Sequence, residues 1–330
     1  MGLQTVCFDT KPYDLPGLTK YGEEAGVSFR FLETKLNAHT AALAEECGAK
    51  AVCIFVNDRA DRAAIDRLCS AGVKLIALRC AGVNNVDMAY AEGKISVIRV
   101  PGYSPHAVAE HAMGMLLSSV RHLHKAYART RDFNFSLRGL TGIELYGKTV
   151  GVVGTGRIGR VFAELCRGFG MRVLAYDKFP DPASGLCYVP LEQLLAESDV
   201  ISLHCPLTED TRHLIGRESI STMKPGVVLL NTSRGALVDT AALLEGIKSR
   251  RIGAACMDVY EEEADVFFED RSDDILQDDT LARLLSMPNV LVTSHQAFLT
   301  REALDTIARE TCFGIRRFFE GEKEKMRGTS

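Results

Sequence analysis

The sequence predicts an α/β fold made of two doubly wound domains, each with a parallel β-sheet between layers of helices. Three observations predict it. Short runs rich in Val, Ile and Leu alternate with amphipathic helical segments along the chain. The runs fall into two series, and a glycine-rich turn follows the first run of the second series. The length of 330 residues also suits about two domains.

The two series of apolar runs give the expected strands, because uninterrupted runs of this length suit strands buried on both faces of a sheet. In the first series, the expected strands are Val6–Phe8, Ala51–Val56, Lys74–Leu78 and Ser96–Val100. In the second series, they are Thr149–Val153, Arg172–Tyr176, Val200–Leu203, Val227–Leu230, Gly253–Met257 and Val290–Thr293.

One long helix is expected between the two series. Ser104 can cap its start, and Pro105 suits its first position. Apolar residues then recur from Ala107 to Leu123. Because Pro101 and Gly102 interrupt the chain just before this helix, we expect the first domain to end near residue 101.

A second amphipathic run, Ala303–Phe319, follows the last expected strand. A helix in this position could return to the first domain. The charged residues after it predict a frayed, solvated end.

Composition and charge exclude several classes of protein. A hydrophobic share of 46% with 25% charged residues is ordinary for a globular protein. The net charge of -4 gives no basic surface for nucleic acid or an anionic membrane. No run reaches about 18 apolar residues and the first residues lack a basic-then-apolar pattern, so neither a membrane span nor a secretory signal is expected. Ten cysteines without a CxxC pair predict free thiols in the cytoplasm and no metal site.

The most informative segment is GKTVGVVGTGRIGRVFAELCRGFGMRVLAYD. It places Gly154, Gly156 and Gly159 in a GxGxxG pattern between an expected strand and an expected helix, Arg157–Gly168. The first glycine permits a tight turn, the second lets the backbone approach a pyrophosphate, and the third lets the helix pack closely on the strand. The helix N-terminus supplies N–H groups and a positive dipole end to the phosphates. The pattern predicts a bound dinucleotide, with a purely structural turn as the alternative.

Asp177 follows the next expected strand, where an acidic residue can accept hydrogen bonds from the ribose hydroxyls of the adenosine. Its charge would repel a ribose 2'-phosphate, so NAD is expected rather than NADP. Arg157 and Lys178 are neighbouring cations that could weaken this preference.

Three charged or titratable residues follow strands of the second series, where open α/β sheets bind their ligands. Arg234 follows GVVLLN, Glu263 follows GAACMD, and His295 follows NVLVT. Catalysis at a hydroxyl group next to a carboxylate needs a cation to hold the carboxylate, a group that moves the hydroxyl proton, and a residue that orients this group. Taken singly, the three are more simply explained as a solvated cation, one of three consecutive glutamates and a structural histidine. Their shared position favours the functional interpretation but leaves both open.

Several longer segments are more specific than the glycine pattern. They are DVISLHCPLTEDTRHLIG, MKPGVVLLNTSRGALVD, MDVYEEE, SHQAFLT, AVCIFVND, IALRCAGVNNVD, AVAEHAMGM, RTRDFNFSL and FFEDRSDDILQDD. Together they resemble the D-isomer-specific 2-hydroxyacid dehydrogenase family over nearly the whole chain. Within that family, the chain is similar to the branch of fermentative bacterial D-lactate dehydrogenases.

The resemblance implies a fold, a cofactor and a reaction. Residues 102–298 would form a Rossmann-type domain that binds NAD. Residues 1–101 and 299–330 would form a flavodoxin-like substrate domain, with a cleft between the two domains. The implied reaction is the reduction of pyruvate to D-lactate by NADH, in a homodimer or a homotetramer.

The resemblance also implies roles for single residues. Arg234 would bind the substrate carboxylate, and His295 would be the acid/base residue, paired with Glu263. Asp258 would lie near the nicotinamide. The other residues implied to contact the cofactor, besides Arg234, Asp177 and the three glycines, are Arg157, Ile158, Cys205, Pro206, Thr211, Thr232 and Ser233. Those implied to lie at the substrate are Ala81 and Gly82, through their backbone, with Tyr103 and Phe298.

The chain departs from the family pattern at one place. Many members have proline directly after the glutamate, where this chain has Ala264, and the acidic segment ADVFFEDRSDDILQDD begins there. Such an insertion resembles those of the lactate branch of the family, and it favours lactate over phosphoglycerate as the substrate class.

Two other functions stay open. Another 2-oxo acid, such as phenylpyruvate or glyoxylate, could be the preferred substrate, because the shape of the pocket decides this. A nucleotide-sensing binding protein could use the same fold, as corepressors of the broad family do, although the chain lacks long disordered flanks for recruiting partners. A zinc enzyme is disfavoured, because the cysteines and histidines lack ligand spacing.

Overall fold

The computed structural model describes residues 2–263 and 266–327. Contacts divide the chain into two units, which we call the first unit (Met1–Ser104 with Leu299–Ser330) and the second unit (Pro105–Phe298). The sequence places this division near residue 101, and the contacts place it directly before the helix that begins at Pro105.

The first unit is built on a five-stranded parallel sheet with the order β2-β1-β3-β4-β5. The chain moves first to one edge of the sheet and then to the other, which confirms the predicted doubly wound class. The strands are β1 (Leu3–Cys7), β2 (Val27–Phe31), β3 (Ala51–Ile54), β4 (Leu75–Leu78) and β5 (Ser96–Arg99).

β2 was not predicted from the sequence, and the burial of this strand explains why. Val27, Phe29 and Phe31 are buried or half-buried, whereas Ser28 and Arg30 between them are exposed. β2 pairs only with β1 and forms an edge of the sheet. An edge strand with one solvated face alternates polar and apolar residues, so it lacks the uninterrupted apolar run that identified the other strands.

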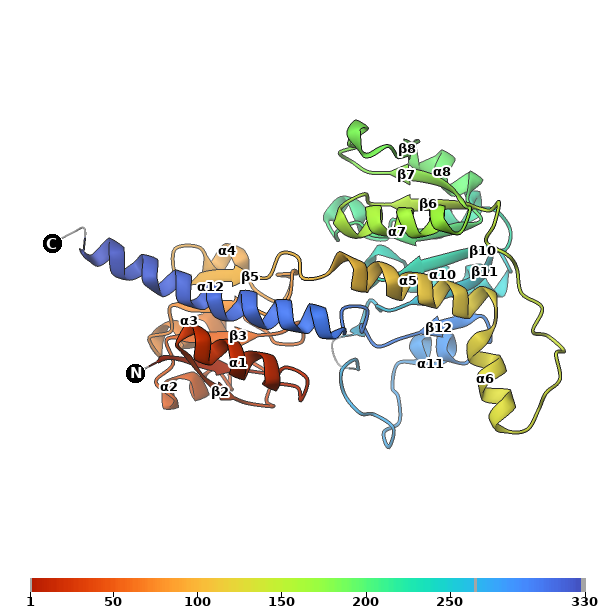
Figure 1. The fold of residues 1–330 in the computed structure, drawn as a ribbon. Helices are drawn as coiled ribbons and strands as arrows, with labels where there is room; N and C mark the ends of the chain where they lie inside the picture. Colours follow the sequence, from red (N-terminus) through yellow and green to blue (C-terminus); the bar gives the residue numbers. More distant parts are fainter. Residues whose placement is uncertain (1, 264–265, 328–330) are drawn as a thin grey trace. The chain divides into compact units, whose positions relative to one another are not determined.

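Two helices from opposite ends of the chain cover one face of this sheet. α1 (Leu15–Ala25) and α12 (Arg301–Arg327) pack together there (Figure 1), around a cluster that includes Leu18, Cys312 and Ile315. The C-terminal helix therefore returns to the first unit. It continues to Arg327, so the expected frayed end after Phe319 is wrong for the described residues. The other helices of this unit are α2 (Ala42–Glu46), α3 (Arg62–Ser70) and α4 (Met88–Ala91).

The second unit contains a seven-stranded parallel sheet with the order β12-β11-β10-β9-β6-β7-β8. The chain reverses its direction across the sheet between β6 and β9, and open α/β sheets bind ligands beside such a reversal. The expected strands are present, but the two-residue edge strand β8 was missed because it is too short to show a pattern. The strands are β6 (Thr149–Val153), β7 (Arg172–Tyr176), β8 (Cys187–Tyr188), β9 (Val200–Leu203), β10 (Val227–Asn231), β11 (Ile252–Met257) and β12 (Val290–Val292).

Helices cover both faces of the second sheet. α5 (Pro105–Val120) and α7 (Arg157–Gly168) pack against each other on the face that receives Val152, and Val153 points to the cluster on the other face. The helices on that other face are α8 (Leu191–Glu197), α9 (Arg217–Thr222), α10 (Thr240–Lys248) and α11 (Asp279–Leu285). Short 3-10 turns occur at Pro182–Ser184, Glu209–Thr211 and Gly235–Leu237. In the described ranges, no helix is both long and apolar enough to cross a membrane.

The single helix expected between the two series is two helices. α5 ends at Val120, and α6 (Leu123–Arg131) follows after His122, whose φ of 52° is left-handed. The carbonyl oxygen of Val120 accepts a hydrogen bond from the backbone nitrogen of Ile143 at 3.1 Å. A tertiary contact thus occupies the acceptor at the end of α5, which the local sequence could not indicate.

Candidate active site

The GxGxxG turn joins β6 to α7. Gly154 has a φ of 93°, and a Cβ atom there would lie 2.5 Å from the backbone nitrogen of Cys205. A Cβ atom on Gly159 would collide with the carbonyl oxygen of Gly154. At Gly156, a Cβ atom would meet no atom of the described chain within 4 Å. Protein packing therefore explains two of the glycines, whereas Gly156 faces open space in which a ligand could approach the backbone.

α7 begins at Arg157 directly after this turn. No side chain caps its N-terminus, so the N–H groups of its first turn stay available to an anion. The Arg157 side chain is exposed, whereas Ile158 packs partly into the apolar cluster beneath the helix. Ile158 can therefore offer a ligand its backbone rather than its side chain.

Asp177 follows β7 and holds the glycine turn. Its Oδ2 accepts hydrogen bonds from the backbone nitrogen of Thr155 at 2.7 Å and from the Thr155 hydroxyl at 3.1 Å, and its Oδ1 accepts one from the nitrogen of Phe179 at 2.9 Å. Partial burial opposes the charge, but these hydrogen bonds hold the pKa of Asp177 below its usual value. The next residue, Lys178, forms an ion pair with Asp210 at 2.6 Å.

The loops after β9 and β10 are tied to each other. The Ser233 hydroxyl donates to the carbonyl oxygen of Cys205 at 2.7 Å. The buried Asn231 donates from Nδ2 to the carbonyl oxygen of Arg234 at 2.8 Å and accepts at Oδ1 from the nitrogen of Ser233 at 3.0 Å. These bonds fix the backbone that carries Arg234 at the carboxyl edge of the sheet.

The Arg234 side chain is half-buried, and its Nη1 donates to the carbonyl oxygen of Ser233 at 2.6 Å. Within the described chain, no carboxylate lies within 4.0 Å of its guanidinium nitrogens. Gly235 packs so closely on the carbonyl group of Tyr260 that no Cβ atom would fit between them. The loop of Arg234 therefore contacts the loop that leads to Glu263.

The remaining residues expected at the cofactor differ in what their side chains can offer. The buried Thr232 hydroxyl has no hydrogen-bond partner among the described residues, which suits contact with a polar ligand. The Thr211 hydroxyl is used inside its own loop, because it donates to the carbonyl oxygen of Pro206 at 2.8 Å and accepts from the nitrogen of Thr208 at 2.8 Å. Pro206 is exposed, and burial raises the pKa of the Cys205 thiol to about 11.

Glu263 and His295 lie together. The Nδ1 atom of His295 is 2.7 Å from Oε1 of Glu263, and the two side chains are only 16% and 20% exposed, respectively. Oε2 of Glu263 accepts a hydrogen bond from the backbone nitrogen of Tyr260 at 3.0 Å, which orients the carboxylate. With Nδ1 bonded to the carboxylate, Nε2 is the ring nitrogen that can exchange a proton with a substrate.

Asp258 holds the segment that carries His295. Its carbonyl oxygen accepts from the nitrogen of His295 at 2.6 Å, and its two carboxylate oxygens accept from the nitrogens of Gln296 and Ala297, each at 2.9 Å. His295 has a φ of 53°, an uncommon conformation that costs about 1–3 kcal/mol and persists only where its surroundings impose it. Burial opposes the charge on Asp258, but hydrogen bonds from His111, Thr293 and Ala297 keep its pKa below the usual value.

The acidic insertion also reaches this pair. The rings of Phe268 and His295 have centroids 5.8 Å apart. Ala264, where the chain departs from the family pattern, and Asp265 lie outside the described residues. Phe298, expected at the substrate, is buried.

Ala81, Gly82 and Tyr103 belong to the first unit, so the structure gives their positions only within that unit. Ala81 and Gly82 lie in the loop after β4. The carbonyl oxygen of Ala81 accepts from Nη1 of Arg99 at 2.8 Å, and that of Gly82 accepts from the Cys80 thiol at 3.3 Å. Tyr103 is half-buried.

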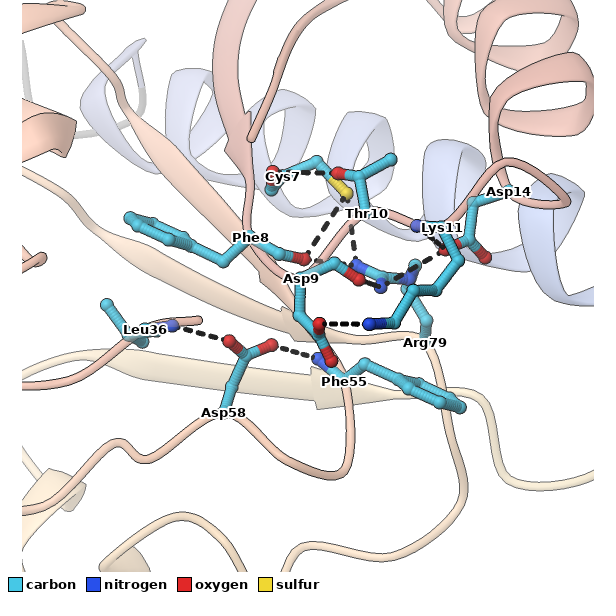
Figure 2. Close-up of polar contacts among 10 residues, drawn as sticks. All are labelled: Cys7, Phe8, Asp9, Thr10, Lys11, Asp14, Leu36, Phe55, Asp58 and Arg79. Atoms are coloured by element: carbon cyan, nitrogen blue, oxygen red, sulfur yellow. Dashed lines mark hydrogen bonds and ion pairs between the residues drawn. The ribbon is translucent and has the colours of Figure 1, made fainter. Parts of the chain in front are cut away.

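A buried arginine anchors the start of this loop (Figure 2). Arg79 directly follows β4, and its side chain is 1% exposed. Its Nη1 and Nη2 donate to the carbonyl oxygens of Phe8 and Asp9 at 3.1 and 3.0 Å, and Nη2 pairs with Asp14 at 3.3 Å. Nη1 also lies 3.0 Å from the sulfur of Cys7. Arg79 thereby joins the loops that follow β4 and β1.

Comparison with known proteins decides the family. Residues 113–297 match the family model described as D-isomer specific 2-hydroxyacid dehydrogenase, NAD binding domain. The D-lactate dehydrogenase of Escherichia coli is 50% identical over 324 residues, which cover 97% of this chain and 98% of that protein. The chain belongs to the D-isomer specific 2-hydroxyacid dehydrogenase family. As a member of this family, it is an NAD-dependent oxidoreductase.

Solved structures of other proteins are also similar to this chain. The pyruvate reductase of Chlamydomonas reinhardtii has a TM-score of 0.90 at 46% identity, and the alignment covers 96% of each chain. A D-lactate dehydrogenase from Aquifex aeolicus, complexed with NAD and lactic acid, has a TM-score of 0.85 at 32% identity over 98% of each chain.

The residues of the glycine turn fit the NAD expected of this family. Gly156 has no side chain and lets a ligand approach the backbone closely, and the uncapped N-terminus of α7 offers N–H donors. The ionised Asp177 offers an acceptor for the ribose hydroxyl groups. For a metal ion, the described part of the chain holds no group of three or more His, Cys, Asp or Glu residues that could bind it.

Several residues that hold the family's expected site residues in place were not predicted from the sequence. They are Asn231, Gly235, Arg79, Phe268 and His111. The first two stand in the segment NTSRG beside Arg234, so a signal was available for them. The contacts of the other three join distant parts of the chain, and no local pattern reveals them.

Proposed function

We propose that this member of the family is a D-lactate dehydrogenase that reduces pyruvate with NADH and uses His295 as its acid/base residue. Relatives described as D-lactate dehydrogenase or pyruvate reductase, at 46–50% identity, support the substrate. The observation that carries the mechanism is the 2.7 Å contact between Nδ1 of His295 and Glu263. This contact leaves Nε2 as the proton donor and holds the ring in one orientation.

In the proposed reaction, Arg234 binds the substrate carboxylate through paired hydrogen bonds from its planar guanidinium group. NADH, when bound, would supply the hydride for the carbonyl carbon. The imidazolium form of His295 donates the Nε2 proton to the carbonyl oxygen as negative charge develops there. Glu263 stabilises the imidazolium and keeps the ring from turning. In the opposite direction, the neutral ring accepts the hydroxyl proton of D-lactate.

The cofactor part of the proposal uses the second unit. The N–H groups of Arg157, Ile158 and Gly159 would bind the pyrophosphate, and Asp177 would accept hydrogen bonds from the ribose. The buried Thr232 hydroxyl, which has no hydrogen-bond partner in the described part of the chain, supports contact with a polar group of the cofactor. Other proposed cofactor residues are Cys205, Pro206, Thr211, Ser233 and Asp258. Ala81, Gly82, Tyr103 and Phe298 are the proposed substrate residues besides Arg234 and His295.

The test is NADH oxidation, followed by absorbance, with pyruvate, phenylpyruvate, glyoxylate and oxaloacetate in parallel. We expect the highest kcat/KM with pyruvate, and oxidation of D-lactate but not of L-lactate in the opposite direction. A higher kcat/KM with phenylpyruvate or glyoxylate would reassign the substrate within the family. Binding of NADH without turnover of any 2-oxo acid would point instead to a nucleotide-sensing protein.

We also propose a homodimer or a homotetramer in the cytoplasm. Large apolar side chains are exposed along α6 and the segment after it, and a second copy of the chain could cover them. They are Leu123, Tyr127, Phe133, Phe135, Leu137 and Tyr146. All ten cysteines are free, which supports a reducing compartment. Light scattering would give the mass in solution, and Phe133→Ser with Phe135→Ser should lower it; an unchanged mass would exclude this segment as the interface.

A further inference from the structure

We propose that His111, on α5, is a positioning residue for the reaction: it holds Asp258, and Asp258 holds the segment that carries His295. This inference rests on the proposed role of His295. It adds a second histidine, which touches neither cofactor nor substrate in the proposed mechanism.

The side chains of His111 and Thr293 meet at the carboxylate of Asp258. Nε2 of His111 lies 3.2 Å from Oγ1 of Thr293 and 3.4 Å from Oδ1 of Asp258. The Thr293 hydroxyl donates to the same Oδ1 at 2.6 Å. Asp258 follows β11 and Thr293 follows β12, so α5 is joined to the carboxyl ends of two neighbouring strands.

The Asp258 carboxylate needs these partners because its side chain is 0% exposed. A buried carboxylate is unfavourable unless hydrogen bonds or an opposite charge compensate it. Within the described residues, His111 is the one basic side chain within 4.0 Å of this carboxylate. His111 itself is 21% exposed, so it lies between the buried carboxylate and solvent.

Asp258 transmits its position to His295 through the backbone. Its carbonyl oxygen binds the nitrogen of His295, and its carboxylate binds the nitrogens of Gln296 and Ala297. Three consecutive amides are thus fixed by one residue. Because His295 has a left-handed backbone, it depends on such external constraints to keep its conformation. A carboxylate that rotates after loss of His111 would shift this segment and misdirect Nε2 of His295.

A purely structural role for His111 makes different predictions, and two substitutions separate the roles. His111→Gln keeps an N–H donor close to the position of Nε2. His111→Leu removes the donor and keeps an apolar body on α5. We expect His111→Leu to lower kcat for pyruvate by roughly 10- to 100-fold, because small errors in the placement of a reacting group have effects of this size. His111→Gln should retain most of the activity.

The decisive experiment is a double-mutant cycle of His111→Leu with His295→Gln. If His111 acts through His295, then His111→Leu should have almost no further effect on the residual rate of His295→Gln. The chain has no Trp, so NADH affinity can be followed by the fluorescence of the bound nicotinamide. We expect His295→Gln to bind NADH as the parent does. In His111→Leu, the fold-loss in kcat should exceed any fold-change in the dissociation constant for NADH, which Asp258 also contacts in the proposed function.

Two results would overturn the inference. One is an equal fold-loss from His111→Leu in the presence and absence of His295. The other is a loss of kcat in His111→Leu that His111→Gln shares to the same extent. His106→Gln, at an exposed position on the same helix, is the matched control and should behave as the parent. Failure of the proposed function is distinguishable, because the parent would then lack pyruvate reductase activity or His295→Gln would retain it.

Discussion

His295 is held at three points, by Glu263 at Nδ1, by Asp258 at the backbone and by the ring of Phe268. An isolated structural histidine does not need all three contacts. Together they fix the ring and leave Nε2 as the atom that can transfer a proton. We predict that His295→Gln lowers kcat for pyruvate by about 10²–10⁴-fold, the usual value of general acid catalysis. NADH affinity should change little. A variant with a lower melting temperature and parental kcat per folded molecule would mark the residue as structural.

Arg234 is half-buried, and within the described chain its guanidinium group has no carboxylate partner. We predict that Arg234→Ala lowers kcat/KM for pyruvate by about 10²–10⁴-fold, since it removes two charge-assisted hydrogen bonds of roughly 1.5–3 kcal/mol each. Arg234→Lys keeps the charge but loses the planar fork, so it should mainly raise KM. Arg217→Ala, at an exposed ion pair on α9, is the control. Near-parental kinetics in Arg234→Ala would exclude the carboxylate role.

At the scale of the element, Asp177 does two things for the turn between β6 and α7: its hydrogen bonds hold the shape of the turn, and its carboxylate places a negative charge there. We predict that Asp177→Ala raises the ratio of kcat/KM with NADPH to that with NADH, because it removes the charge that repels a 2'-phosphate. The rate with NADH should also fall, because Thr155 and Phe179 lose their acceptor. The ratio is therefore the informative quantity, and an unchanged ratio would mean that Asp177 does not contact the ribose.

Elements were predictable where the physical signal is local. The central strands show uninterrupted apolar runs, and the GxGxxG turn combines strand, turn and helix signals within one segment. β2 and β8 lie at edges or are too short, and the break after α5 depends on a hydrogen bond from Ile143. The same limit applies to the site. Strand ends identify Glu263 and His295, whereas His111 lies 182 positions from Thr293 and is brought there by the packing of α5 on the sheet.

At the scale of the whole molecule, each unit has its own core, and the first unit buries a network of charged groups at the carboxyl ends of its strands (Figure 2). Asp58 is part of this network. Its two oxygens accept from the backbone nitrogens of Leu36 and Phe55 at 2.6 and 2.5 Å. Burial nevertheless raises the pKa of Asp58 to about 7, because it outweighs these hydrogen bonds and the attraction of Arg79.

This raised pKa predicts how the stability of the first unit depends on pH. The folded unit keeps the Asp58 proton up to pH about 7, whereas the unfolded chain releases it near about 3.9. The folded state therefore binds more protons in this window, and its stability should fall as pH rises through it, by up to about 4 kcal/mol. Other groups titrate in the same range, so the informative quantity is the difference between the parent and Asp58→Asn. Native-state hydrogen exchange of amides in β3 and β4 measures it for this unit alone.

Between pH 5 and 8, the unfolding free energy of the parent should fall by more than that of Asp58→Asn. At pH 5 the variant should be the less stable protein, because the NH2 group of its amide faces a backbone N–H. Glu92→Gln, at an exposed acid of the same unit, should follow the parent at every pH. Amides of the second unit should not respond to Asp58→Asn, because they belong to a separate core. If the unfolding free energy of the parent and of Asp58→Asn depends on pH with equal slopes, then Asp58 is ionised throughout this range. Its two backbone hydrogen bonds would then outweigh the effect of burial.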